Sequence, residues 1–99
     1  MMNIDDVSDE VASEAKEMVR QTMAPFGFSA VEVRAGEDHD GDPALFIDAY
    51  YKPVGEPIDP RVAADLRSKL RDRLWRLGEK RYPYVRHHFA EHQKVVGFS

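Results

Sequence analysis

The chain has 99 residues, a formal net charge of −4 and no cysteine, and 42% of its residues are hydrophobic. This composition excludes a disordered chain and a disulfide scaffold, and no apolar run approaches the roughly 20 residues that a membrane-spanning helix needs. The acidic N-terminus lacks the basic and apolar regions of a signal peptide. We therefore expect one small domain over residues 1–99, with 93–99 as a candidate mobile tail, in a cytoplasmic, bacterial-type protein that contacts no membrane.

Charge is distributed unevenly along the chain. Residues 1–59 carry 14 acidic and 4 basic residues, a net charge of −10, whereas residues 60–99 carry 4 acidic and 10 basic residues, a net charge of +6. Such polarity predicts either an acidic partner for the basic part or attraction between the two parts, within a monomer or across a dimer. The overall isoelectric point of about 5.5 argues against a general nucleic-acid binder.

The first expected element is an amphipathic helix near the N-terminus. Asn3 or Asp5 can cap its start, because their side-chain oxygens can accept hydrogen bonds from first-turn amides. The helix should end before Pro25, and Gly27 should form the turn that follows. Apolar residues recur at helical spacing and predict a face that packs on the core: Ile4, Val7, Val11, Ala15 and Met18.

Two strands joined by a polar loop should follow as an antiparallel hairpin, over residues 28–35 and 44–52. The second strand alternates, so one of its faces should be aliphatic and the other should carry Phe46, Asp48 and Tyr50. Asp48 is therefore the one carboxylate that we expect on a sheet face rich in aromatic side chains.

A second helix is predicted from Asp59 to about Lys80. Asp59 suits the N-cap, Pro60 suits the first helical position, and Gly78 is an expected terminator. Its apolar stripe consists of Val62, Leu66, Leu70, Leu74 and Leu77.

Trp75 lies well away from that stripe on the helical wheel, so the main core cannot bury it. Large aromatic side chains are seldom left bare and are enriched at interfaces. We expect another chain, or the C-terminal residues Val95, Val96 and Phe98, to cover Trp75.

A basic ridge should run along one edge of the same helix, because its four members are spaced by four, three and four residues: Lys69, Arg73, Arg76 and Lys80. The ridge is open to two interpretations. It can contact nucleic-acid phosphates, or it can be an ordinary solvated face in which Lys69 pairs with Asp65 and Arg76 with Asp72.

After Gly78, Pro83 forbids an uninterrupted helix, and Tyr84 to Phe89 predicts a third strand. A helix from about Val85 is the alternative. The element order predicts an α+β fold, an α-β-β-α-β two-layer sandwich in which the hairpin and the third strand carry two helices on one face. This order resembles the cytoplasmic domain of cation diffusion facilitators, a likeness of topology alone.

The stretch His88, Glu91 and His92 matches the H-x-x-E-H pattern of inverzincin metallopeptidases. That family needs a third ligand far downstream, and only seven residues follow His92, so we disfavour a peptidase. A non-catalytic zinc-like site through His87, His88 and His92 is an alternative, with a carboxylate from the loop 37–42. The loop itself does not fit an EF-hand, because Gly41 precedes its third acidic residue.

Together these patterns favour a small non-enzymatic interaction or regulatory module, with a protein partner or a second copy in a homodimer. Its expected interface residues are Trp75, Phe46, Tyr50 and Tyr84. The alternatives are zinc-like metal binding through the histidines and nucleic-acid binding through the basic ridge. No cofactor is expected unless zinc binds.

Overall fold

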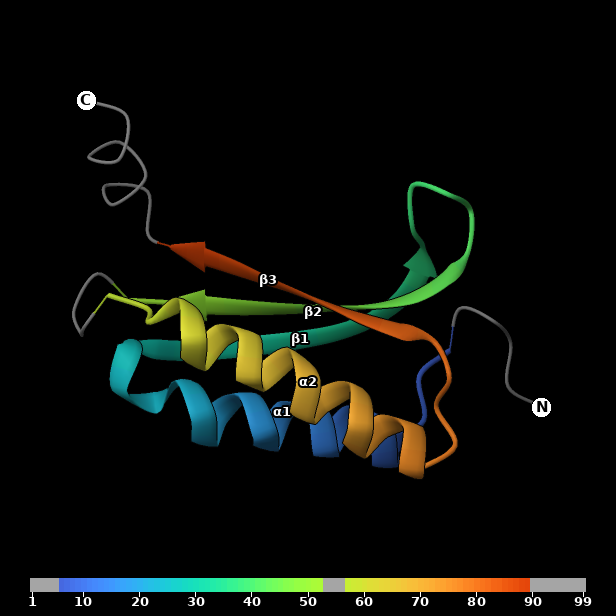
Figure 1. Ribbon diagram of the computed structural model, residues 1–99, viewed down its shortest axis with the longest axis horizontal. Helices are drawn as coiled ribbons and strands as arrows, with labels where there is room; N and C mark the ends of the chain where they lie inside the picture. Colours follow the sequence, from blue (N-terminus) through green and yellow to red (C-terminus); the bar gives the residue numbers. More distant parts are fainter. Residues whose placement is uncertain (1–5, 53–56, 90–99) are drawn as a thin grey trace.

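A computed structural model describes residues 6–52 and 57–89 (Figure 1). Five main elements follow one another in the order α1 (Asp9–Met23), β1 (Phe28–Glu37), β2 (Pro43–Tyr51), α2 (Pro60–Arg76) and β3 (Tyr82–Phe89). A single turn of 3-10 helix, Ala24–Phe26, connects α1 to β1. The expected tail at 93–99 lies outside the described residues.

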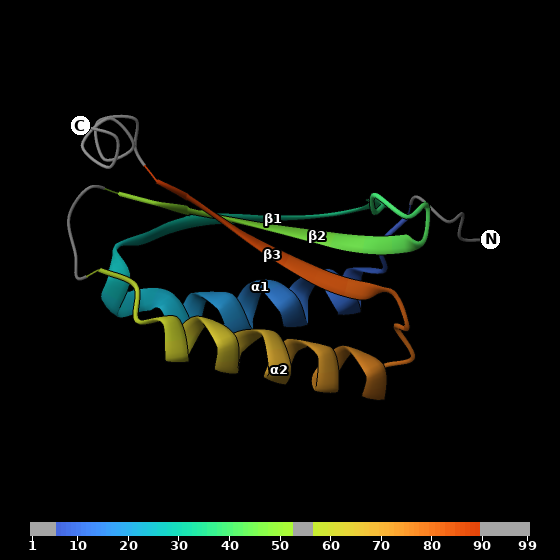
Figure 2. The same cartoon turned by 45° about the horizontal axis from the view of Figure 1, so that its top comes forward.

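The three strands form one mixed sheet with β2 in the centre. β1 and β2 are antiparallel neighbours, and β3 runs parallel to β2 because the crossing helix α2 returns the chain to the same end. Both helices lie against one face of the sheet (Figures 1 and 2). The two-layer α-β-β-α-β prediction is therefore confirmed.

The alternative helix from Val85 is wrong, because Tyr82–Phe89 pairs along its whole length with β2. Pro83 lies within this strand, which is possible because β3 is an outer strand of the sheet. The strand begins two residues before the predicted start at Tyr84.

The first helix begins later than predicted. Ser8, and not Asn3 or Asp5, is its N-cap, and the Ser8 hydroxyl accepts a hydrogen bond of 3.2 Å from the Val11 amide. Residue 6 lies outside the helix, and its carbonyl accepts a hydrogen bond of 2.8 Å from the Arg81 guanidinium. That contact with the far end of the chain is absent from any local sequence pattern.

The second helix starts as predicted and ends earlier. Asp59 accepts a hydrogen bond of 2.9 Å from the Arg61 amide, and Pro60 is the first helical residue. The last helical residue is Arg76, four residues before the predicted end at Lys80, because Gly78 takes a left-handed conformation with φ of 88°. No helix in the described part of the chain is long and apolar enough to span a bilayer.

The core fills the space between the two helices and the sheet face that they cover. Ala15 of the expected α1 face, Leu66 and Leu70 of the expected α2 stripe and Ile47 of β2 are fully buried in it. Val19 and Met23 of α1, which lie beside the expected face, are also fully buried, whereas Met18 is only partly buried. A smaller cluster of Val11, Leu45 and Leu74 extends the core toward the hairpin end of the sheet. Trp75 takes no part in either cluster, as its position on the helical wheel predicted.

Candidate interaction surfaces

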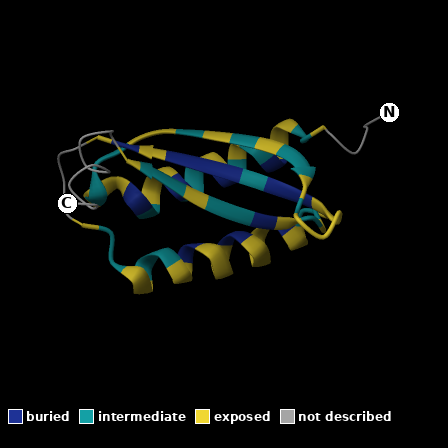
Figure 3. Ribbon diagram, turned by 90° about the horizontal axis from the view of Figure 1, so that it is seen from above, coloured by how far each residue is buried: buried dark blue, intermediate teal, exposed yellow. Residues whose placement is uncertain are grey.

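The sheet face opposite the helices, which we call the open face, is covered by no helix or strand among residues 6–52 and 57–89 (Figure 1). Figure 3 looks onto the sheet and shows the central strand largely buried between its two neighbours. The alternation of the strands places polar and aromatic side chains on the open face: Glu32, Arg34, Phe46, Asp48, Tyr50, Tyr84, Arg86 and His88.

Asp48 lies at the centre of the open face, and only 3% of its surface is exposed. Arg86 donates two hydrogen bonds to its carboxylate, at 2.9 and 3.2 Å. Nε2 of His88 lies 2.7 Å from Oδ1 of the same carboxylate, and Arg34 adds a longer ion pair at 3.6 Å. Side chains from both outer strands therefore enclose one charged group on the central strand.

These contacts determine the ionisation of Asp48. Burial alone would raise the pKa of the carboxyl group, but the hydrogen bonds and charges of Arg86 and His88 outweigh burial. The pKa of Asp48 therefore lies below its ordinary value, and the group is a carboxylate at neutral pH. A carboxylate whose oxygens already accept these hydrogen bonds is suited to anchoring cationic side chains, and poorly suited to accepting a proton from a substrate.

Phe46 is the aromatic residue of the open face that contacts both arginines. Its ring stacks on Tyr84 with 5.8 Å between ring centres, and the guanidinium groups of Arg34 and Arg86 lie 5.2 and 4.9 Å from its centre. Beneath the ring lies Gly36, where a β-carbon would come within 3.1 Å of the Phe46 ring. The absence of a side chain at position 36 therefore lets the ring lie flat on β1.

Tyr50 and Tyr84 complete the aromatic part of the face. Tyr50 stacks on His88 with 4.9 Å between ring centres, and 36% of Tyr50 is exposed. The Tyr84 hydroxyl donates a hydrogen bond of 3.0 Å to Asp38 in the hairpin loop. Three of the four expected interface residues thus come together on one surface: Phe46, Tyr50 and Tyr84.

The acidic hairpin loop brings the carboxylates of Asp38, Asp40 and Asp42 within 4.8 Å of one another. Asp38 accepts hydrogen bonds from the backbone amides of Asp42 and Asp40, which shape the turn. The amide of Asp42 is the largest influence on the pKa of Asp38, which lies below its ordinary value. Turn formation accounts for the position of the Asp38 carboxylate.

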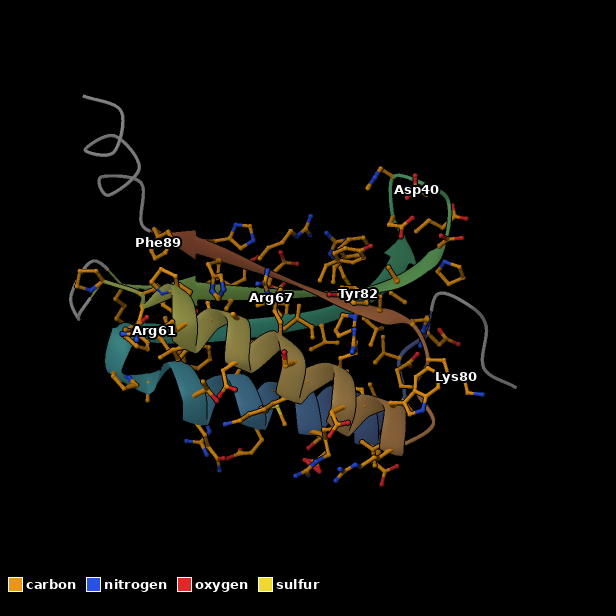
Figure 4. All side chains as sticks on the ribbon, in the orientation of Figure 1. Asp40, Arg61, Arg67, Lys80, Tyr82 and Phe89 are labelled. Atoms are coloured by element: carbon orange, nitrogen blue, oxygen red, sulfur yellow. The ribbon has the colours of Figure 1, made fainter. Side chains whose placement is uncertain are left out.

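The fourth expected interface residue, Trp75, lies on a different surface. It is 59% exposed and lines a hollow of about 440 Å³ together with Arg71, Lys80 and Tyr82. The Lys80 ammonium lies 5.6 Å from the centre of the indole ring. Figure 4 shows Lys80 and Tyr82 at this end of α2, close to the start of β3. We call the surface between α2 and the outer edge of β3 the α2–β3 groove.

No family model matches this chain, and no curated protein matches it. It is similar in structure to the amide bond synthetase McbA from Marinactinospora thermotolerans, at 18% sequence identity and a TM-score of 0.45. A point mutant of the same enzyme gives 19% identity and the same TM-score. Each likeness covers 88% of this chain and 18% of the synthetase, so the chain spans less than a fifth of that enzyme. A likeness this distant carries no argument about function.

The predicted basic ridge is largely neutralised. Lys69 pairs with Asp65 at 2.9 Å and Arg76 with Asp72 at 3.2 Å, as the sequence predicted for an ordinary solvated face. A third member, Arg73, pairs with Glu14 of α1 at 2.9 Å. The fourth, Lys80, lies beyond the end of the helix over Trp75, so its inclusion in the ridge was wrong.

The histidines predicted as metal ligands do not converge in the described residues. Nδ1 of His87 lies 2.7 Å from the Tyr51 hydroxyl on the helix-covered side, whereas His88 contacts Asp48 on the open face. Burial keeps the pKa of His87 below its ordinary value and raises the pKa of Tyr51 to about 12, so we assign Tyr51 as the donor. His92 and Glu91 lie outside the described residues.

Sequence reasoning anticipated Asp48 on an aromatic face and missed its partners. Strand register places both arginines beside it. Arg86 is directly opposite Asp48 on β3, and Arg34 on β1 is opposite Phe46, two positions along from Asp48. The parallel pairing of β2 with β3 was the missing information. Tyr82 and Arg71 were also missed, because only the packing of α2 against β3 brings them together.

Proposed function

We propose that this chain is a non-enzymatic protein-interaction module that associates through its open face. The observation that carries the proposal is the open face itself, a sheet surface that no helix or strand of residues 6–52 and 57–89 covers. On it a buried carboxylate holds arginine and histidine side chains beside aromatic rings. Stacked tyrosine, phenylalanine and arginine side chains are enriched at protein interfaces.

A second copy of the chain is the partner that we favour. The exposed part of the open face carries charges of both signs, with Glu32 near Arg34 and Arg86. A surface that contains both signs can be complementary to itself across a twofold axis. The opposite charges of the two halves of the chain support the same arrangement.

Sedimentation of the full chain over a range of concentrations tests this proposal. We expect a monomer–dimer equilibrium in the parent, and a shift to monomer in Tyr50→Glu, because a new carboxylate on the open face would be buried without a partner. Trp75→Glu is the control, since Trp75 is also an exposed aromatic residue but lies on α2, in the α2–β3 groove. It should leave the dimer unchanged.

Two results would contradict the proposal. A parent chain that remains monomeric at high micromolar concentration would remove self-association. A dimer that survives Tyr50→Glu but not Trp75→Glu would move the interface from the open face to the α2–β3 groove.

A further inference from the structure

The cations on the two long sides of α2 differ in whether they form ion pairs. On one side, the ridge residues Lys69, Arg73 and Arg76 each form an ion pair. On the other side, Arg67 and Arg71 form no ion pair within residues 6–52 and 57–89. Unpaired cations therefore gather on the side of the helix that faces β3.

The side of α2 that carries Arg67 and Arg71 also lines two hollows. The 440 Å³ hollow beside Trp75 adjoins a second of about 340 Å³, and the two share Arg71 and Tyr82. The second hollow continues along α2 past Arg67 to Ala64. Figure 4 shows Arg67 and Tyr82 along the line where α2 and β3 meet. The hollows together make an elongated groove, a shape that suits an extended ligand.

The groove has an unusual aromatic content for a solvent-facing surface. Trp75 is 59% exposed and Tyr82 is 44% exposed. The carboxylates in its lining are already engaged, because Asp72 pairs with Arg76 and Glu79 with Arg81. The groove therefore presents aromatic rings and a surplus of positive charge.

β3 contributes Tyr82, its first residue, to both hollows, and the outer edge of the strand runs on from there. β3 pairs with β2 on one side, and no strand pairs with its other side in the described part of the chain. An outer strand offers backbone donors and acceptors to an extended peptide laid alongside it. Pro83 supplies no amide hydrogen, so such pairing would use the residues that follow it.

We propose that the α2–β3 groove binds an extended acidic peptide segment of a partner protein. Acidic side chains of the segment would pair with Arg67 and Arg71, and an apolar side chain would pack on Trp75 and Tyr82. A nucleic acid would meet the same cations, but the edge of β3 that no described strand pairs with offers backbone hydrogen bonds that an extended peptide can use. This binding is separate from association through the open face.

Trp75 provides the readout, because it is the only tryptophan in the chain. The full chain is used to select binders from a random peptide library, and the enriched peptides are synthesised and titrated at low salt. We expect peptides rich in Asp and Glu that shift the Trp75 emission to shorter wavelength as they shield the indole from water.

Two double variants with the same charge change then locate the site. Arg67→Gln with Arg71→Gln should weaken peptide binding by about tenfold or more, since both removed cations face the groove. Lys69→Gln with Arg73→Gln removes two cations from the opposite edge of α2, whose partners Asp65 and Glu14 do not line the groove, and should change binding by less than about twofold. Neither pair should alter sedimentation of the chain, which reports on the open face.

Three outcomes would overturn the inference. The first is a selection with no enrichment of acidic residues, and the second is equal loss of binding in the two double variants. The third is tighter binding of a single-stranded oligothymidylate that displaces the peptide and shifts the Trp75 emission, which would make nucleic acid the ligand of the groove.

Discussion

The central strand β2 is shielded on its two faces by layers of opposite character. On the helix-covered face, Ile47 and Leu45 are fully buried by apolar side chains, with Leu66 and Leu74 of α2 among them. On the open face, Asp48 is almost as deeply buried, but by charged and aromatic side chains that are themselves partly exposed to solvent.

The difference means that the helix-covered face has a structural role, whereas the open face is suited to binding. Apolar burial against two helices cannot be exchanged without unfolding the chain. The arginine and histidine layer, in contrast, keeps side chains such as Arg86 nearly half exposed, so a partner can cover them without separating them from Asp48. The two faces of β2 should therefore contribute separately, one to stability and the other to binding. Substitutions at adjacent positions of the strand can test this.

The largest effect should come from the helix-covered face. Ile47→Ala leaves a cavity in the main core, and we expect it to lower the free energy of unfolding by about 3 kcal/mol. Denaturant unfolding monitored by circular dichroism measures the change. Phe46→Ala, at the adjacent position on the open face, is the control and should cost roughly 1 kcal/mol, because its ring is only partly buried. Equal losses would mean that the open face is a second core.

Removal of the carboxylate on the open face should have an intermediate effect. Asp48→Ala leaves Arg34, Arg86 and His88 without their shared acceptor, and we expect a loss of about 2 kcal/mol, moderated because those side chains can turn to solvent. Glu32→Ala, an exposed acid opposite Asp48 on β1, should change stability by less than about 0.5 kcal/mol. A neutral or stabilising Asp48→Ala would show that the ion pairs do not hold the face together.

The smallest effect should be a dependence of stability on pH that comes from His87 on the helix-covered face. Burial lowers the pKa of His87, so the unfolded chain binds its proton more readily, and stability falls as the pH drops below about 6.5 toward the lowered pKa. The loss should be at most about 1 kcal/mol. His87→Gln keeps an acceptor for the Tyr51 hydroxyl and should flatten the profile between about pH 7 and pH 5.

Asp48 changes its protonation state at lower pH than His87. It therefore does not affect the comparison of the parent with His87→Gln. Its pKa is lowered, so its contribution is present above about pH 4 and is lost only as the pH falls through the lowered pKa. A profile for His87→Gln as steep as that of the parent would assign the pH dependence to some other group.

Much of the fold was predictable because it rests on local signals. The cap at Asp59, the leucine stripe around Leu70 and the alternation about Ile47 each depend on a short stretch of sequence, and each was confirmed. The start of α1 was misplaced even though its cap, Ser8, is a favourable local signal, because Asn3 and Asp5 offer the same cap chemistry a few residues earlier. The end of α2 was misplaced because the conformation of Gly78 prevailed over the favourable residues that follow it.

The candidate surfaces were predictable only one strand or one helix at a time. Period-2 alternation put Phe46 and Asp48 on the same face, and helical spacing put Trp75 outside the core. Which side chains join them depends on contacts between elements, and neither the pairing of Arg86 with Asp48 nor the approach of Tyr82 to Trp75 leaves a periodic signal. The metal-ligand hypothesis illustrates the same limit, since adjacent histidines on a strand point to opposite faces.

The parallel pairing of β3 with β2 also has a consequence for the order in which the chain folds. The β1–β2 hairpin joins neighbouring segments, whereas Val85 meets Ile47 only after 38 intervening steps along the chain. Closing so long a loop costs chain entropy before any contact is gained, so β3 should be added late, onto a hairpin already supported by α1. The open face then exists only in the finished molecule, because Arg86 and His88 arrive with the last strand. A partner that recognises this face would therefore distinguish completely folded chains from partly folded ones.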